Sequence, residues 1–485
     1  MERDLVEFAQ LFQRFMQQMS DTAWSLGGSP LKELLDRHLG TDCSTLPVIA
    51  DSFPSYDHAN LQVALSAFLA AEGRRHELIG LSGQQRHYGS LSDLVEMGHH
   101  QIWVRLGSAD YVNLPIGPDE TLACVQFGLL LLEDRGARAV VLMRGPDEHG
   151  PHQAVSLEIL CVDHGTARSL LAEVHRLMVE LNVFRGQVLS FGQSRMGFVG
   201  AGPVNFHRRP QVSREDLVLP AGALEAIERE VCAVAAYSER LRRSGQHVKR
   251  GLLLYGPPGN GKTLTVRYLI SRLSGHTVVL LTGGGLQMIG PACGLARMLQ
   301  PSVVVLEDVD LVAEERTMNP FGNPALFDLL NEMDGMAEDA DVAFLLTTNR
   351  VDLLEPALAA RPGRVDLAVE IGPPDEEAQR RLIELFGRGL TLRLGDVDTI
   401  VARTRGVAAS FLKELVRKAA VIAADRADGS GGAGADGSGR LTVTDADVNA
   451  ALDELLTETG ALTHALLGGG TPGREPARGA PPSLR

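Results

Sequence analysis

The sequence predicts an α/β fold for the C-terminal part of the chain and an α+β domain before it. One stretch, 251–269, places an apolar run, a Gly-rich loop and a helical pattern directly after one another. Apolar runs at 277–281, 303–306 and 342–347 then alternate with helical patterns, which is typical of buried strands in one sheet. Between residues 101 and 191, strand-like runs are separated by Gly, Pro and Asp turns.

Length, charge and cysteine usage narrow the class of protein. A chain of 485 residues holds about three domains of roughly 150 residues each. Its 46 basic and 61 acidic side chains give a net charge of −15, which disfavours a general nucleic-acid or membrane-surface binder. The 5 cysteines are far apart and include no Cys-x-x-Cys pair. We therefore expect neither a zinc site nor disulfides. We also expect the protein to be in a reducing compartment.

The sequence shows no targeting segment and no membrane span. The first residues, MERDLVEFAQ, carry no basic stretch ahead of an apolar core, unlike a signal peptide. The longest apolar run, 122–132, is interrupted by Gln126 and Gly128 and is too short to cross a bilayer. We expect a soluble, cytoplasmic protein with no membrane and no nucleic-acid partner.

Residues 1–205 are expected to form one α+β domain. Apolar residues at helical spacing predict helices over 2–20, 30–39, 58–72 and 167–181. Strands are predicted over 101–106, 121–132, 137–143, 155–162 and 185–191. No catalytic or metal-ligating cluster stands out in this domain, and recognition of a client or partner is the role left open for it.

The Gly-rich loop matches the phosphate-binding pattern GxxxxGK[ST], with a strand before it and a helix after it. It consists of Gly256, Pro257, Pro258, Gly259, Asn260, Gly261, Lys262 and Thr263. The glycines let successive backbone N–H groups face phosphate oxygens, and the helix N-terminus adds partial positive charge. We expect Lys262 to neutralise the terminal phosphates of a nucleotide and Thr263 to bind Mg²⁺.

Polar side chains end two of the later strands. Glu307 and Asp308 follow the run 303–306, where Mg²⁺ and the attacking water need carboxylates. We expect both acids to be catalytic and to ligate the metal with Thr263, and the sequence leaves open which of them activates the water. Asn349 follows the run 342–347, where an amide can position that water.

Two arginines, Arg361 and Arg364, flank a Pro-Gly turn that we expect at the surface. They are either solvated turn residues or trans-acting charges that reach the γ-phosphate held by a neighbouring subunit.

Taken together, residues 213–466 resemble the AAA subfamily of the AAA+ ATPases. GPPGNGKT is similar to its Walker A motif, VVVLEDVD to Walker B, TTN to sensor 1, and LLNEMDG with TTNRVDLLEPALAARPGRVD to its second region of homology. The resemblance implies a P-loop AAA+ module with a parallel five-stranded sheet, helices on both faces and a small helical lid. It also implies that ATP and Mg²⁺ are bound and that ATP is hydrolysed at the subunit interfaces of a homo-oligomeric ring, usually a hexamer.

By this resemblance, Glu307 takes the metal-supporting position and Asp308 the water-activating one. Asn349 takes the sensor position, and Arg361 and Arg364 take the arginine-finger positions. The Glu-Asp order reverses the usual one, and the same order is found in the family of the mitochondrial AAA translocase that inserts the Rieske protein.

The resemblance also divides the chain. Residues 206–372 are expected to form the large ATPase subdomain and 373–466 the lid, with a Gly-rich insertion at 428–439. Residues 467–485 have the composition of a disordered tail. Residues 155–188 are similar to the middle domain of the translocase family named above.

The expected function is ATP hydrolysis that remodels, unfolds or disassembles a protein client, in a chaperone-like role. The alternative is a slow nucleotide-dependent switch or scaffold without substrate threading. The short Asp308 and the lack of an aromatic residue in Met288-Ile289-Gly290, the nearest match to a pore loop, favour that alternative. The net charge disfavours a nucleic-acid motor, and the presence of Lys262 disfavours an inactive pseudo-ATPase.

Overall fold

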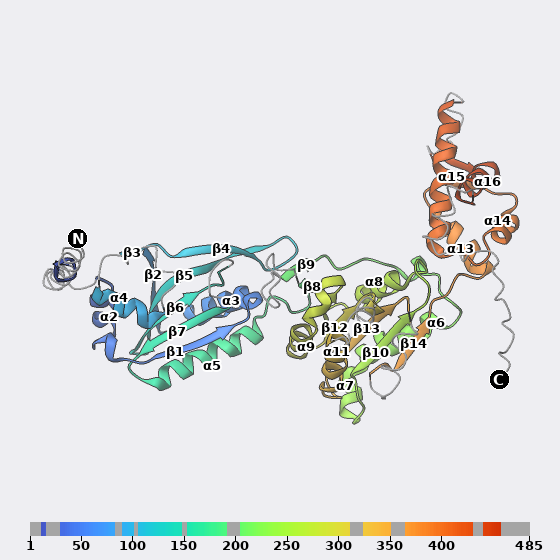
Figure 1. Ribbon diagram of the computed structural model, residues 1–485. Helices are drawn as coiled ribbons and strands as arrows, with labels where there is room; N and C mark the ends of the chain where they lie inside the picture. Colours follow the sequence, from blue (N-terminus) through green and yellow to red (C-terminus); the bar gives the residue numbers. More distant parts are fainter. Residues whose placement is uncertain are drawn as a thin grey trace, which may run out of the picture. The chain divides into compact units, whose positions relative to one another are not determined.

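The computed structural model describes residues 11–15, 30–82, 90–100, 105–147, 153–191, 204–310, 324–350, 364–429 and 440–456. The chain divides into two compact units, Met1–Arg208 and Arg209–Arg485, close to the boundary expected after residue 205 (Figure 1). None of the helices in these described ranges is long and apolar enough to cross a membrane.

The first unit contains an antiparallel sheet with the strand order β1-β7-β6-β5-β2-β3, and β4 also pairs with β5. The strands are β1 (Val48–Phe53), β2 (Arg74–Ser82), β3 (Arg105–Gly107), β4 (Asp110–Pro115), β5 (Thr121–Asp134), β6 (Ala137–Arg144) and β7 (Val155–Cys161). The helices are α2 (Pro30–Leu39), α3 (His58–Leu69), α4 (Leu91–His100) and α5 (His164–Glu180). Two further strands, β8 (Val188–Phe191) and β9 (Val204–His207), pair antiparallel with each other.

Helices cover both faces of this sheet, which explains the long apolar run of β5. Leu130 and Leu132 pack in a core with residues of α3 and α5. Leu129 and Leu131 pack in a second core with residues of α2 and α4. Because successive strand residues point to opposite faces, a strand segment covered on both sides is apolar at successive positions.

The pattern-based prediction for the first unit was incomplete. It missed β1, β2, β4, β9 and α4, although it placed α2, α3, α5 and the strands β5, β6, β7 and β8 correctly apart from their ends. Of the predicted helix over 2–20, only residues 11–15 are described, and they are helical. Of the predicted strand over 101–106, the first four residues lie outside the described ranges.

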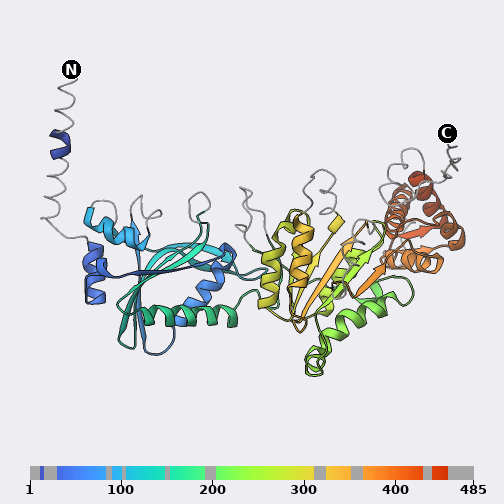
Figure 2. The ribbon, with the colours of Figure 1, turned by 60° about the horizontal axis from the view of Figure 1, so that its bottom comes forward.

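The parallel strands of the second unit run in the order β14-β10-β13-β12-β11, which confirms the expected α/β sheet. They are β10 (Arg250–Tyr255), β11 (Thr277–Leu281), β12 (Ser302–Leu306), β13 (Val342–Thr348) and β14 (Leu367–Glu370). Every residue of β12 and β13 is buried, as in a sheet covered on both faces. The helices of this part are α6 (Ala223–Ile227), α7 (Val234–Arg243), α8 (Lys262–Arg272), α9 (Ile289–Met298) and α11 (Pro324–Asp334), with the π-helical stretch η4 (Glu228–Ala233) joining α6 to α7 (Figure 2).

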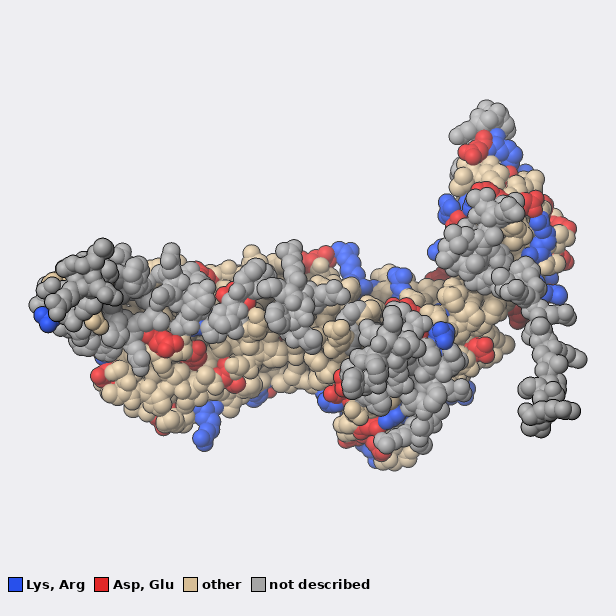
Figure 3. Space-filling model, in the orientation of Figure 1, with Lys and Arg blue, Asp and Glu red and all other residues tan. Residues whose placement is uncertain are grey.

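The lid follows β14 and has its own apolar core. It consists of α13 (Glu376–Phe386), α14 (Val397–Arg403), α15 (Ala409–Gly429) and α16 (Asp445–Leu456), with a small parallel ladder of β15 (Thr391–Arg393) and β16 (Thr442–Thr444). On the face seen in Figure 3, basic and acidic side chains are interspersed over these helices rather than segregated. The expected Gly-rich insertion and tail lie largely or wholly outside the described residues.

A buried ion pair lies where β10 and β13 begin. Arg250 Nη1 donates to Asp341 Oδ1 at 2.9 Å, and the two side chains are 2% and 6% exposed. Nε and Nη2 of Arg250 have no partner among the described residues.

We expect Asp341→Ala to lower the free energy of unfolding by about 3–5 kcal/mol, because it leaves a buried guanidinium without a counter-charge. Urea unfolding measures this change, and the double variant Arg250→Met with Asp341→Leu should lose much less; an equal loss would show that the charge is not the cause.

Candidate active site

The phosphate loop lies at the carboxyl end of β10 and connects it to α8. Gly256, Gly259 and Gly261 have φ values of 133°, 80° and 104°, in the region that favours glycine over residues with a Cβ. The loop therefore needs glycine at these positions to turn from strand to helix. The next two strands in the sheet, β13 and β12, end beside it, so groups that follow β10, β12 and β13 meet at one edge.

Lys262 is the buried cation of this loop. Its side chain is 6% exposed, and Nζ donates to the carbonyl oxygens of Gly256 at 2.7 Å and Pro257 at 3.0 Å. Burial lowers the pKa of the ammonium, and the negative charges of Asp308 and Asp310 oppose that shift. The loop therefore holds one positive charge where its backbone turns, as a polyphosphate site requires.

Thr263 and Glu307 form the part of the site that suits a divalent metal. The Thr263 side chain, on α8, lies close enough to the carboxylate of Glu307, the residue after β12, to lower the pKa of that carboxyl. A hydroxyl beside a carboxylate is the kind of oxygen donor set by which Mg²⁺ is held next to a phosphate. The Thr263 hydroxyl and the Glu307 carboxylate therefore fit a Mg²⁺ site. Of the two acids that follow β12, Glu307 is the one next to Thr263.

Asp308 and Asn349 form the second part of the site. Asn349 Nδ2 donates to Asp308 Oδ1 at 3.3 Å, and the Asp308 backbone N–H donates to Thr347 Oγ1 at 3.1 Å. Asp308 has a φ of 53°, a left-handed conformation that turns its exposed carboxylate away from the path of a regular strand. Of the two acids, Asp308 is the one held next to the amide at the end of β13.

Asp310 is a strand-end acid to which the sequence analysis assigned no role of its own. It is 6% exposed and accepts hydrogen bonds from Thr348 Oγ1 at 2.9 Å and from the Asn349 N–H at 3.1 Å. It thereby fixes the turn that presents Asn349. Its place two residues after Asp308 was visible in the sequence, but its partners lie at the end of a different strand, β13.

The expected surface position of Arg364 was wrong. Arg364 is 8% exposed, and its Nε and Nη2 donate to the two carboxylate oxygens of Asp334 at 2.9 and 2.8 Å. Asp334 is the last residue of α11, and this bidentate pairing raises the pKa of the guanidinium. Arg361 lies outside the described residues.

The pKa of Glu307 yields a prediction about stability. Burial, and then the negative charge of Asp308, raise this pKa above its ordinary value. The ionised form is therefore disfavoured in the folded state, and the free energy of unfolding falls as pH rises from the ordinary glutamate pKa through the raised one. Above that window we expect Glu307→Gln to melt at a higher temperature than the wild type. Below it the two melting curves should coincide; a lower melting temperature at neutral pH would contradict the assignment.

The phosphate loop, together with Glu307 and Asp308 at the same edge of a parallel sheet, defines a nucleotide-binding protein of the P-loop α/β class. Residues 252–373 match the model of the ATPase family associated with various cellular activities (AAA). The chain therefore contains an AAA-family ATPase domain, as the resemblance of its motifs implied.

Several curated proteins are similar to parts of this chain. The chain is 34% identical over 252 residues to the ATP-dependent zinc metalloprotease FtsH 2 of Sphaerobacter thermophilus, covering 49% of this chain and 36% of that protein. It is 29% identical over 388 residues to FtsH 4 of the same organism, covering 76% of this chain and 56% of that protein. It is 32% identical over 189 residues to the 26S proteasome regulatory subunit 8 homolog of Schizosaccharomyces pombe, covering 36% of this chain and 47% of that protein. The chain thus spans about a third to just over half of these relatives, and the likeness of 155–188 to the translocase family stays a prediction.

Proposed function

We propose that this protein is a Mg²⁺-dependent ATPase that hydrolyses ATP at the carboxyl edge of its parallel sheet. The observation that carries the proposal is that three groups converge there: Lys262 in the loop, the Thr263–Glu307 pair, and Asp308 with Asn349. These are a phosphate-binding cation, a metal site and a carboxylate aimed by an amide, which together are the parts of an in-line phosphoryl transfer.

Each residue has one role in this mechanism. Lys262 binds the terminal phosphates, and Thr263 with Glu307 holds the metal. Mg²⁺, when bound, supplies positive charge that stabilises the negative charge of the reacting phosphates. Asp308 accepts the proton of the attacking water, and Asn349 keeps its carboxylate in place.

We further propose that hydrolysis serves to unfold, remodel or disassemble a protein client in the cytoplasm, in a chaperone-like homo-oligomeric ring, a hexamer. Support comes from the names of the relatives, which include a protease and a proteasome regulatory subunit. The proposal does not include proteolysis. The one His-Glu pair of the sequence, His76-Glu77, is followed by Gly80 where a zinc-protease HExxH motif requires histidine.

The alternative is a slow nucleotide-dependent switch that does not thread its partner. It is favoured by the burial of Met288 and Ile289, which are 7% and 2% exposed. Met288 and Ile289 occupy the sequence positions of the pore-loop residues that would contact a threaded client. In the structure, however, both side chains are packed into the protein. A client in the pore would not contact them in this conformation.

The arginines test whether sites are completed by a neighbouring subunit. We propose that Arg361 acts in trans on the γ-phosphate, and that Arg364, paired with Asp334, acts with it as the second finger or holds it in place. Asp308→Asn and Arg361→Ala should each lose most of the turnover alone while retaining ATP binding. An equimolar mixture should recover about one quarter of wild-type turnover, because random assembly pairs an intact site with an intact finger at that frequency.

Arg364→Ala provides the matched comparison in this experiment. Recovery of turnover on mixing with Asp308→Asn would give Arg364 a trans role as well, whereas failure to recover would assign it to its own subunit. No recovery in either mixture would contradict catalysis at a shared interface.

A further inference from the structure

The lid helix α15 begins without a capping residue of its own. The residue before it is Ala408, whose methyl group cannot accept a hydrogen bond and which is 0% exposed. The first N–H groups of an α-helix have no partner within the helix, and side-chain oxygens usually satisfy them. At a buried helix start without such a residue, the acceptors must come from elsewhere in the fold.

The phosphate loop supplies these acceptors. The Ser410 N–H donates to the Gly259 carbonyl oxygen at 2.9 Å, and the Ala409 N–H donates to Asn260 Oδ1 at 3.1 Å. Asn260 Nδ2 in turn donates to the Pro257 carbonyl oxygen at 3.3 Å. Asn260 is only 4% exposed. Its side chain therefore joins the loop to the lid instead of facing solvent.

Gly259 makes this approach possible. A Cβ on Gly259 would lie 2.2 Å from Ser410 Oγ and 3.4 Å from Ala408 Cβ, and its φ of 80° already favours glycine. The backbone of the phosphate loop therefore lies directly against the first turn of α15.

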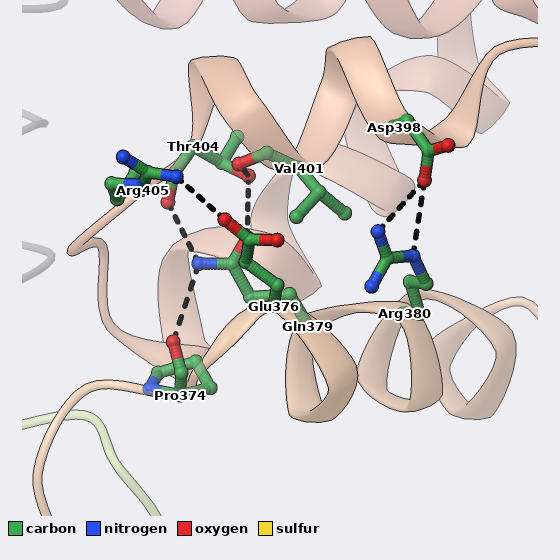
Figure 4. A network of polar contacts seen from close by, with 8 residues as sticks. All are labelled: Pro374, Glu376, Gln379, Arg380, Asp398, Val401, Thr404 and Arg405. Atoms are coloured by element: carbon green, nitrogen blue, oxygen red, sulfur yellow. Dashed lines mark hydrogen bonds and ion pairs between the residues drawn. The ribbon is translucent and has the colours of Figure 1, made fainter.

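On the lid side, a buried network holds the segment that leads into α15 (Figure 4). Gln379 of α13 donates to the Thr404 carbonyl oxygen at 2.9 Å and accepts from the Thr404 hydroxyl at 3.0 Å. At the exposed edge of this network, Arg405 pairs with Glu376 at 2.6 Å. These contacts tie α13 and the turn after α14 together, so a displacement at the start of α15 is transmitted to the lid as a whole.

We propose that Asn260 is a positioning residue that caps the lid helix from within the phosphate loop, so that the lid follows the conformation of the loop. The reason is geometric: the loop turns backbone N–H groups toward phosphate, while a carbonyl oxygen and an amide oxygen of the same loop bind α15. A change in the loop on nucleotide binding therefore reaches α15 directly. The consequence of this contact, that ATP turnover is coupled to the lid, rests on the proposed ATPase function.

Hydrogen exchange at residues 406–420 tests the cap. Asn260→Ala should speed exchange of the first α15 amides by about tenfold, the effect of losing one helix cap. It should also abolish the change in their exchange on adding a non-hydrolysable ATP analogue. Ala409→Pro removes the donor instead of the acceptor at a helix position that tolerates proline. The double variant should be no worse than the worse single variant, since both break the same bond.

Kinetics separate positioning from general damage. Asn260→Ala should lower kcat by about tenfold and leave KM within about threefold, and Asn260→Thr, which restores an oxygen acceptor, should recover part of the loss. The control is Asn449→Ala, which removes an asparagine whose described contacts are all inside the lid. Unchanged exchange in Asn260→Ala and additive effects in the double variant would each overturn the inference. Absence of turnover in the wild type, with the exchange effects intact, would instead overturn the ATPase proposal.

Discussion

Replacing Lys262 by alanine should weaken ATP binding by about 2–5 kcal/mol, roughly 30- to 5,000-fold, the usual cost of removing one partner of a buried charge pair. In the structure this side chain is 6% exposed and bonded to two carbonyl oxygens of the loop. Its ammonium is the charge within the phosphate loop itself, and no backbone N–H can replace it.

Titration with a fluorescent ATP analogue measures the loss. Lys418→Ala is the matched control, because Lys418 lies on the lid surface and pairs with Glu454 at 2.6 Å. Both variants should unfold close to the wild-type urea concentration, which separates lost binding from lost folding. Wild-type affinity in Lys262→Ala would place the nucleotide site elsewhere.

Replacing Asp308 by asparagine should lower ATP turnover by about 100- to 10,000-fold, the usual contribution of a general base, with ATP affinity nearly unchanged. Asparagine is the informative substitution because the residue has a φ of 53°. Asparagine tolerates that conformation and retains an oxygen for the Asn349 amide, whereas alanine would strain the backbone. The loss would then report the missing proton acceptor.

Phosphate release in a single turnover at saturating ATP measures this step. Asp339→Asn, at an exposed position outside the site, is the control and should behave as the wild type. Asp308→Glu should keep measurable turnover, because it retains a carboxylate. Full turnover in Asp308→Asn together with its loss in Glu307→Gln would reverse the roles assigned to the two acids.

Local sequence was sufficient for the buried strands of the ATPase sheet. The predicted runs 277–281 and 303–306 lie within one residue of β11 and β12, because a strand covered on both faces is continuously apolar. The strands β2 and β4 of the first unit were missed for the opposite reason. β2 begins with Arg74-Arg75-His76-Glu77 and β4 alternates between half-buried and exposed residues, so neither forms an apolar run.

In the active site, sequence reasoning placed the residues of the motifs but not their long-range partners. The Thr263–Glu307 and Asp308–Asn349 contacts follow from parallel strands that end at the same edge. The burial of Arg364 depends on Asp334, and the orientation of Asn260 depends on the lid segment at Ala409, 149 residues away. Such contacts are set by tertiary packing, and no local pattern contains them.

The most direct test of the ATPase account is ATP turnover of the wild type over a series of protein concentrations, with the mass measured by light scattering in each nucleotide state. We predict Mg²⁺-dependent turnover per chain that rises as the chains assemble into a ring and that is absent in Lys262→Ala. Tight ATP binding without hydrolysis at any concentration would contradict the ATPase account and favour the nucleotide-dependent switch.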